Sequence, residues 1–333
     1  MVKRISGIFS LISIILITVF SVSCQKNKSA PTYFETVSTK YINQVIASGN
    51  KLWVLSSTPQ KWVDIGIVLP PYQISVIDLE TGEFIINEEI PAISAMTLDN
   101  LEKPVLATFD RRILKVNEDL SWEEFFKLPA AGLIQRIVCS QDDYIAIPTY
   151  TSGLYLYNGT DTLILDTPDS TLKEHGLTFL VRDMDSNIWF TQISDLFMID
   201  RNKKIIRDPE RLPYDNPAGA AFLSADKDNA LWVSKWDGND HRIFKKAINS
   251  YWVEIPPPES SGRRPIKFIR SDSSGRIWIA YSQYPKDLLA YYESGKWNVL
   301  QIPLDKIVIL DVDTWNDEII IGTSEGIYRT KMK

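Results

Sequence analysis

The sequence predicts an all-β fold, a seven-bladed β-propeller of four-stranded blades. The first supporting observation is a short run of strand-forming residues that recurs seven times along the chain. The central residues of these runs lie 52, 40, 44, 43, 46 and 42 residues apart, and they are Trp53, Val105, Ile145, Trp189, Trp232, Trp278 and Ile320. A repeat of this length is typical of one propeller blade.

A second series of markers follows the same period. Six of the repeats end in an apolar residue or a threonine followed by a proline, at Pro91, Pro129, Pro168, Pro213, Pro256 and Pro303. Proline cannot donate a hydrogen bond within a strand ladder, so it belongs where the outermost strand of a blade has ended. Two independent markers in phase therefore support the same division of the chain.

The turn residues complete the prediction. In the sixth repeat, the turns Asp-Ser-Ser-Gly at residues 272–275 and Glu-Ser-Gly-Lys at residues 293–296 lie between predicted strands at 266–270, 277–281, 288–292 and 297–302, and they are rich in Asp, Ser and Gly. These turn residues tolerate the backbone angles that hairpins need. The same reasoning places the blades at about 41–94, 95–132, 133–176, 177–220, 221–265, 266–306 and 307–333, within a single domain spanning residues 33–333.

The seventh repeat contains only three predicted strands before the sequence ends. Residues 33–38 have strand composition and precede the first blade. We expect this N-terminal strand to complete the last blade, because joining both ends of the chain in one sheet removes an exposed sheet edge.

Several predicted strands are apolar at consecutive positions, as in residues 188–190. Such strands are expected where both faces of a sheet are covered, here by the neighbouring blades. We therefore interpret the repeated tryptophans as packing residues. Cys139 follows an apolar pair in a predicted inner strand and is expected to be a small core residue.

The N-terminus resembles the export signal of bacterial lipoproteins. Lys3 and Arg4 precede an apolar stretch at residues 8–22, and Ser23 precedes Cys24. The resemblance implies that residues 1–23 are removed and that Cys24 is lipidated. The family usually has leucine three residues before the cysteine, where this sequence has Ser21. A secreted protein without lipid and an uncleaved anchor are the alternatives.

Residues 24–32 form a polar segment that we interpret as a lipidated tether. Acyl chains on Cys24 would hold the protein to a membrane by burying their methylene groups. Lipoproteins of enteric-type bacteria keep an aspartate after the cysteine when they stay at the inner membrane, and here Gln25 follows it. That resemblance favours the outer membrane, facing the periplasm, over the inner membrane or the cell surface.

The charge of the chain argues against nucleic acid as a partner. The formal net charge is −6, and loss of Lys3 and Arg4 with the signal would leave −8. Nucleic-acid-binding proteins instead concentrate positive charge on one face. A separate expectation concerns the oligomeric state: we expect the protein to be a monomer.

Three copies of one phrase, at residues 183–190, 226–233 and 272–279, place an aspartate six positions before a tryptophan. This phrase resembles the repeat of the two-component-regulator propellers, and the resemblance implies an extracytoplasmic sensor domain that binds a ligand. Residues 78–83 resemble a repeat of quinone-binding propellers and of the propeller lipoprotein of outer-membrane assembly.

Residues 187–192 also resemble the repeat of the streptogramin lyases, propeller enzymes that linearise cyclic peptides with a metal and histidine chemistry. This chain has only two histidines, His175 and His241, and the catalytic residues of that family have no matching positions here.

No metal or cofactor is predicted. The sequence lacks a Gly-x-Ser-x-Gly elbow, a phosphate loop, a dinucleotide-binding glycine pattern and a Cys-x-x-Cys pair. Residues 183–187 begin like a calcium loop, but the twelfth position is Ser194 in place of an acid. Asp237, Asp240 and His241 fall in one loop and leave a cation site open as an alternative.

Functional residues are expected on the face formed by the loops between second and third strands and by the connections between blades. Candidate binding residues on this loop face are Tyr72, Tyr150, His175, Gln192, Lys235, Trp236, Asp237, His241, Arg264, Tyr281 and Tyr284. Aromatic residues beside a few charges suit a protein, peptide or glycan partner. The sequence favours a non-enzymatic binding protein. The alternative is a lyase or hydrolase acting at the channel mouth.

Overall fold

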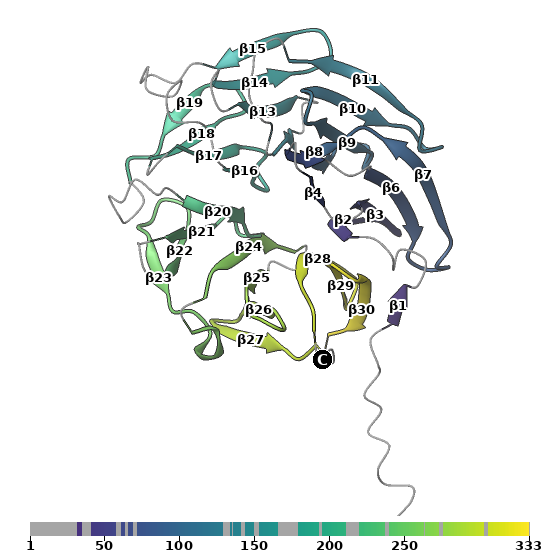
Figure 1. Cartoon of the computed structure of the whole chain (residues 1–333). Helices are drawn as coiled ribbons and strands as arrows, with labels where there is room; N and C mark the ends of the chain where they lie inside the picture. The colour runs from purple at the N-terminus through teal and green to yellow at the C-terminus, as the bar shows by residue number, and fades with distance from the viewer. Residues whose placement is uncertain are drawn as a thin grey trace, which may run out of the picture.

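The structure is a computed structural model, and it describes residues 32–34, 41–57, 61–63, 66–68, 72–128, 134, 136–140, 144–149, 153–165, 179–192, 195–210, 220–236, 240–262, 264–272, 276–302 and 306–332. Within these residues, seven four-stranded antiparallel sheets surround a central axis (Figure 1). The predicted fold class, a seven-bladed β-propeller, is confirmed.

In six of the blades, four strands follow one another along the chain from the axis outwards. The first three blades consist of β2 (Tyr41–Ser48), β3 (Lys51–Ser57), β6 (Tyr72–Asp78) and β7 (Phe84–Ile90); β8 (Ile93–Leu98), β9 (Pro104–Thr108), β10 (Arg112–Val116) and β11 (Trp122–Lys127); and β12 (Val138–Cys139), β13 (Ile145–Thr149), β14 (Gly153–Tyr157) and β15 (Thr162–Leu165). A short hairpin of β4 (Lys61–Val63) and β5 (Gly66–Val68) is inserted between β3 and β6.

The next three blades repeat this order. They consist of β16 (Phe179–Arg182), β17 (Ile188–Gln192), β18 (Asp195–Ile199) and β19 (Ile205–Arg207); β20 (Ala220–Ala225), β21 (Leu231–Trp236), β22 (His241–Lys246) and β23 (Val253–Ile255); and β24 (Ile266–Ser271), β25 (Ile277–Tyr281), β26 (Leu288–Glu293) and β27 (Lys296–Leu300). One turn of 3₁₀ helix, Glu259–Ser261, lies between β23 and β24. The described residues include no helix with the length and hydropathy to cross a membrane.

The seventh blade joins the two ends of the chain. It consists of β28 (Ile309–Trp315), β29 (Glu318–Thr323) and β30 (Gly326–Lys331), and β1 (Thr32–Phe34) is its fourth strand. The antiparallel register pairs Tyr33 with Tyr328, and Figure 1 shows β1 beside β30. The predicted closure by an N-terminal strand is confirmed. The sequence predicts this strand at residues 33–38; the described strand starts one residue earlier and ends at Phe34, and residues 35–38 lie outside the described residues.

The hydrophobic core is divided among the interfaces between blades. The described residues form seven apolar clusters, and each cluster joins residues of two adjacent blades. Between the seventh and first blades, a Cβ atom added to Gly322 would lie 2.8 Å from the Ile42 side chain. Glycine at this position therefore lets the two sheets approach closely. Cys139 is buried between the second and third blades, as predicted.

The repeated aspartate and tryptophan are bonded to each other. The indole Nε1 atoms of Trp189, Trp232 and Trp278 donate to Oδ2 of the preceding motif aspartates at 2.8, 2.9 and 2.9 Å. The Oδ1 atom of each aspartate accepts from the backbone amide four residues further on. Each aspartate therefore closes its turn and satisfies the polar atom of a packed indole. The tryptophans are packing residues, as predicted, and Trp232 and Trp278 are buried.

Candidate functional site

The strand order places the predicted site residues that the structure describes at one end of the blades. Gln192 is the last residue of β17, and Tyr281 is the last residue of β25. Trp236 at the end of β21 pairs with His241 at the start of β22, and Tyr72 at the start of β6 pairs with Ser57. These are all connections from a second to a third strand, so they share the loop face.

Some of these side chains are not accessible at the surface. Tyr72, Gln192, Lys235 and Tyr281 are buried. Burial raises the pKa of the Tyr281 hydroxyl above its ordinary value, and the neighbouring Ser261 opposes this effect. Their burial means that these four side chains offer little surface for contact with a partner.

Tyr150, His175 and Asp237 lie outside the described residues. His241 and Arg264 are partly exposed. No group of three or more histidine, cysteine, aspartate or glutamate side chains arranged to hold a metal ion is found among the described residues.

Tyr284 is a strongly exposed residue among the predicted site residues. Its side chain is 90% exposed, and it lies in the loop between β25 and β26. The loop is held to the neighbouring blade, since the Asp287 amide donates to Ile307 O at 3.0 Å and the Ile307 amide donates to Pro285 O at 3.3 Å. The side chain of Lys286 also donates to the carbonyl of Ile302.

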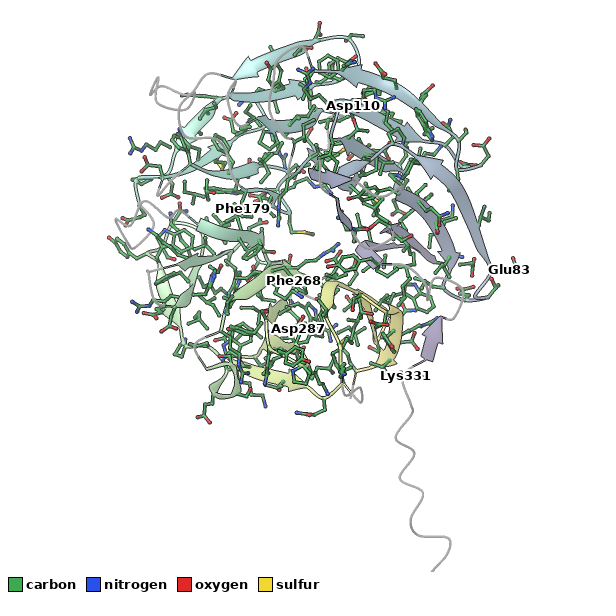
Figure 2. The ribbon with its side chains drawn as sticks, viewed as in Figure 1. Glu83, Asp110, Phe179, Phe268, Asp287 and Lys331 are labelled. Carbon is green, nitrogen blue, oxygen red and sulfur yellow. The ribbon has the colours of Figure 1, made fainter. Side chains whose placement is uncertain are left out.

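The buried carboxylate of Asp287 organises this loop (Figure 2). Its Oδ1 accepts the Gln283 amide at 3.0 Å. Its Oδ2 accepts Lys267 Nζ at 2.6 Å and the Ile309 amide at 2.8 Å. One carboxylate therefore joins the loop to the inner strands of the sixth and seventh blades.

Arg264, in the connection between β23 and β24, is hydrogen-bonded to the same loop. Its Nη1 donates to the Ser260 carbonyl at 2.8 Å and to Oε1 of Gln283 at 2.7 Å. Arg264 therefore has a structural role in addition to its position on the loop face. The structure thus brings Arg264, Tyr281 and Tyr284 together around the connection between β25 and β26.

A second candidate site lies on the axis. A central cavity of about 650 Å³ is lined by residues of all seven inner strands or the segments just before them. Four basic side chains line it, at Arg136, Arg182, Lys267 and Arg270. None of the four is among the site residues predicted from the sequence. The sequence does contain a signal for such residues. It is a single charged residue in an otherwise apolar inner strand, such as Arg182 at the end of β16.

The most strongly bonded of these cations is Arg270. Its Nη1 donates to both carboxylate oxygens of Asp311 at 2.8 and 2.7 Å, and its Nη2 lies 3.3 Å from Oδ2 of Asp313. Burial alone would lower the pKa of Arg270, but Asp311 and Asp313 together raise it above its ordinary value. Burial raises the pKa of Asp313, against the opposing effect of Arg270.

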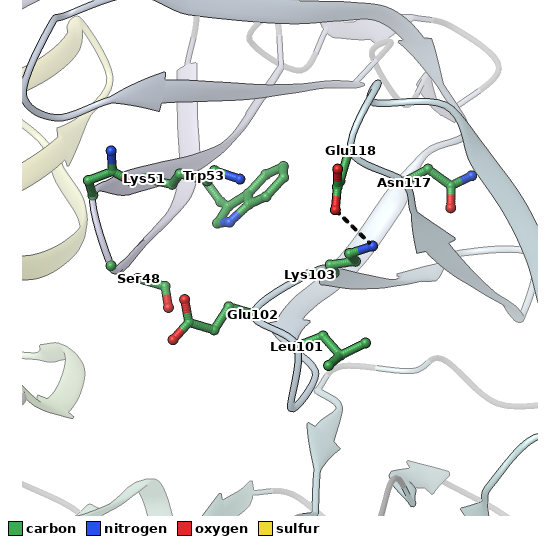
Figure 3. Close-up of a pocket in the computed structure, with 10 residues that line it drawn as sticks. Ser48, Lys51, Trp53, Leu101, Glu102, Lys103, Asn117 and Glu118 are labelled. Carbon is green, nitrogen blue, oxygen red and sulfur yellow. Dashed lines mark ion pairs between the residues drawn. The ribbon is translucent and has the colours of Figure 1, made fainter.

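The opposite face carries a smaller pocket between the first two blades (Figure 3). It encloses about 280 Å³ and is lined by the turns after β2, β8 and β10. Lys103 and Glu118 form an ion pair at 3.4 Å across one wall, and the Glu118 side chain is 81% exposed. Exposed ion pairs contribute little stability, and none of the predicted site residues lies here.

Comparisons with known proteins identify the fold. The chain is similar to virginiamycin B lyase from Staphylococcus aureus, solved with quinupristin, at 14% sequence identity and a TM-score of 0.70 over 91% of this chain and 98% of the lyase. It is similar to YCF48 from Cyanidioschyzon merolae at 10% identity and a TM-score of 0.65, over 91% of this chain and 98% of that protein.

A third similar structure is the Cps50 (Swd1) β-propeller domain from Myceliophteria thermophila, at 14% identity and a TM-score of 0.59 over 88% of this chain and 100% of that domain. No protein-family model and no curated protein matches the sequence. Its structural neighbours thus include streptogramin-lyase-like β-propellers, a likeness of fold that assigns no activity to this chain.

Proposed function

We propose that this protein is a non-enzymatic envelope lipoprotein whose loop face binds a protein, peptide or glycan partner. The observation that carries the proposal is Tyr284, an almost fully exposed aromatic side chain on a loop fixed through Asp287. A rigid aromatic residue contributes contact area at low entropic cost, and tyrosine is enriched among the residues that dominate binding interfaces.

The structural neighbours support a binding function for this fold. One similar structure is YCF48 bound to D1 peptide, at 12% identity and a TM-score of 0.63 over 89% of this chain. The alternative proposal, a lyase or hydrolase acting at the channel mouth, is supported by the similarity to virginiamycin B lyase. Against it, the chain contains only two histidines.

A photo-crosslinking residue placed at Tyr284 is expected to capture a defined envelope partner in living cells. The matched control is Tyr251, which is 74% exposed in the turn between β22 and β23, at the opposite end of the blades. The same adduct from both positions, or no adduct from position 284, would count against the loop face as a protein-binding site.

Replacement of Tyr284 by alanine, alone and together with Trp236→Ala, should weaken binding of the captured protein about tenfold or more, the loss typical of a central interface aromatic. For a glycan partner, cosedimentation with purified peptidoglycan sacculi gives the equivalent measurement. Unchanged binding of both variants would contradict the proposed surface.

Membrane anchoring is proposed from the N-terminal sequence. A Cys24→Ser variant is expected to keep residues 1–23 and to incorporate no radiolabelled palmitate, because the variant lacks the thiol that carries the lipid. The wild-type chain should incorporate label and fractionate with the outer membrane. A mature N-terminus at another residue, without fatty acid on the wild-type protein, would show that the anchor proposal is wrong.

A further inference from the structure

The charges around the central cavity are unequally distributed. On one side, Arg270 is paired with Asp311 and Asp313, and Lys267 is paired with Asp287. These groups belong to the sixth and seventh blades. Asp311 and Asp313 also accept the Val45 and Ala47 amides at 2.9 and 2.8 Å. The carboxylates on this side are therefore already bonded within the fold.

The other side of the cavity presents two arginines from adjacent blades. Arg136 precedes β12 in the third blade, and its guanidinium carbon lies 4.9 Å from the ring centre of Phe179 in the fourth blade. Arg182 belongs to the fourth blade, and its Nη1 donates to the carbonyl of Cys139 in the third at 2.9 Å. Neither arginine forms an ion pair with a carboxylate among the described residues. Apart from Nη1 of Arg182, the guanidinium donors of these two arginines have no hydrogen bond to a described residue.

The environment of Arg136 disfavours its charge. Burial lowers the pKa of Arg136 to about 10, with a contribution in the same direction from Arg270 and an opposing one from Asp311. A bound anion would compensate this cost, because an opposite charge nearby stabilises the charged form. Charge-assisted hydrogen bonds from arginine to carboxylate or phosphate are among the strong interactions in proteins.

Apolar residues, including Ile137, Leu180, Phe268 and Leu310, also line the cavity. A volume of about 650 Å³ is within the range of small-molecule sites, and polar and apolar residues both contribute to the lining. We propose that the central channel binds a small organic anion, with its carboxylate or phosphate group held by Arg136 and with Arg182 as the second cation. This site is separate from the loop face and does not depend on the proposed function.

Binding can be measured by isothermal titration calorimetry on the full mature chain. The probes are benzoate, phenyl phosphate and the neutral benzyl alcohol, which share an aromatic body and differ in the head group. We expect the two anions to bind with a Kd on the order of 1 mM, as suits fragments of this size, and benzyl alcohol not to bind. A preference for one anion would distinguish a carboxylate ligand from a phosphate ligand.

Substitutions of the two arginines test whether the anion binds in the central cavity. Arg136→Gln is expected to weaken anion binding about tenfold or more, and Arg182→Gln by a smaller factor. Arg201→Gln, in an exposed turn away from the cavity, should leave affinity unchanged. Arg136→Lys keeps the charge and should retain part of the affinity, so it provides a folded comparison if Arg136→Gln does not fold. Absence of anion binding by the wild-type chain, equal binding of benzyl alcohol, or full affinity in Arg136→Gln would overturn the proposal.

Discussion

Deletion of residues 25–40 is expected to lower the melting temperature sharply and to make the protein aggregate. The deletion removes β1, whose pairing with β30 completes the seventh sheet. An unpaired β30 would expose an open strand edge that can pair with other chains. At about 25 cal/mol per Å² of apolar surface, the lost burial should cost several kcal/mol, a shift on the order of 10 °C for a chain of this size.

The matched control deletes only residues 25–30, which lie before β1. Differential scanning calorimetry and light scattering should show wild-type melting and no aggregation for this shorter deletion. If both deletions melt at the same temperature, the strand contributes nothing to stability and the N-terminal segment acts only as a linker.

Replacement of Trp278 by alanine is expected to destabilise the protein by about 3–5 kcal/mol, the range for removal of a large buried aromatic side chain. Trp278 is 1% exposed and belongs to the cluster between the sixth and seventh blades. The substitution would leave a cavity at that interface and remove the donor to Asp272. Urea denaturation followed by far-ultraviolet circular dichroism gives the free energy of unfolding.

Trp189→Ala is the matched control for this prediction. Trp189 has the same position in its repeat and the same hydrogen bond to an aspartate, but its side chain is partly exposed. The smaller buried area predicts a smaller loss of stability. Equal losses for Trp189→Ala and Trp278→Ala would mean that the hydrogen bond, and not burial, determines the contribution of this tryptophan.

The architecture could be predicted from the sequence because each blade repeats the same local pattern. The spacing of the strand-forming runs predicted the number of blades. The seventh repeat lacks a fourth strand, and this predicted that an N-terminal strand closes the ring. The bond between Asp272 and Trp278 was not predicted. The spacing shows that the two residues recur together, but only the folded turn brings the carboxylate onto the indole nitrogen.

The candidate site was less accessible to sequence reasoning. Residues such as Lys235 and Tyr281 could be assigned to the loop face from their position in the repeat. Their position did not predict that both side chains are buried. The channel arginines were missed for a different reason. Arg136 and Arg182 are 46 positions apart in the sequence, and they line one cavity only because the inner strands of different blades meet at the axis. The binding role of the loop face stays a prediction.

The closing strand also has a consequence for the order of folding. Thr32 pairs with Arg329, so the contact joins positions almost at opposite ends of the chain. The entropic cost of closing a loop increases with its length, and contacts between distant positions form slowly. A chain synthesised from its N-terminus can form its first blades early. The strand β1 can pair only after β30 has been synthesised. We therefore expect the ring to be completed last, with β1 unpaired until β30 is available.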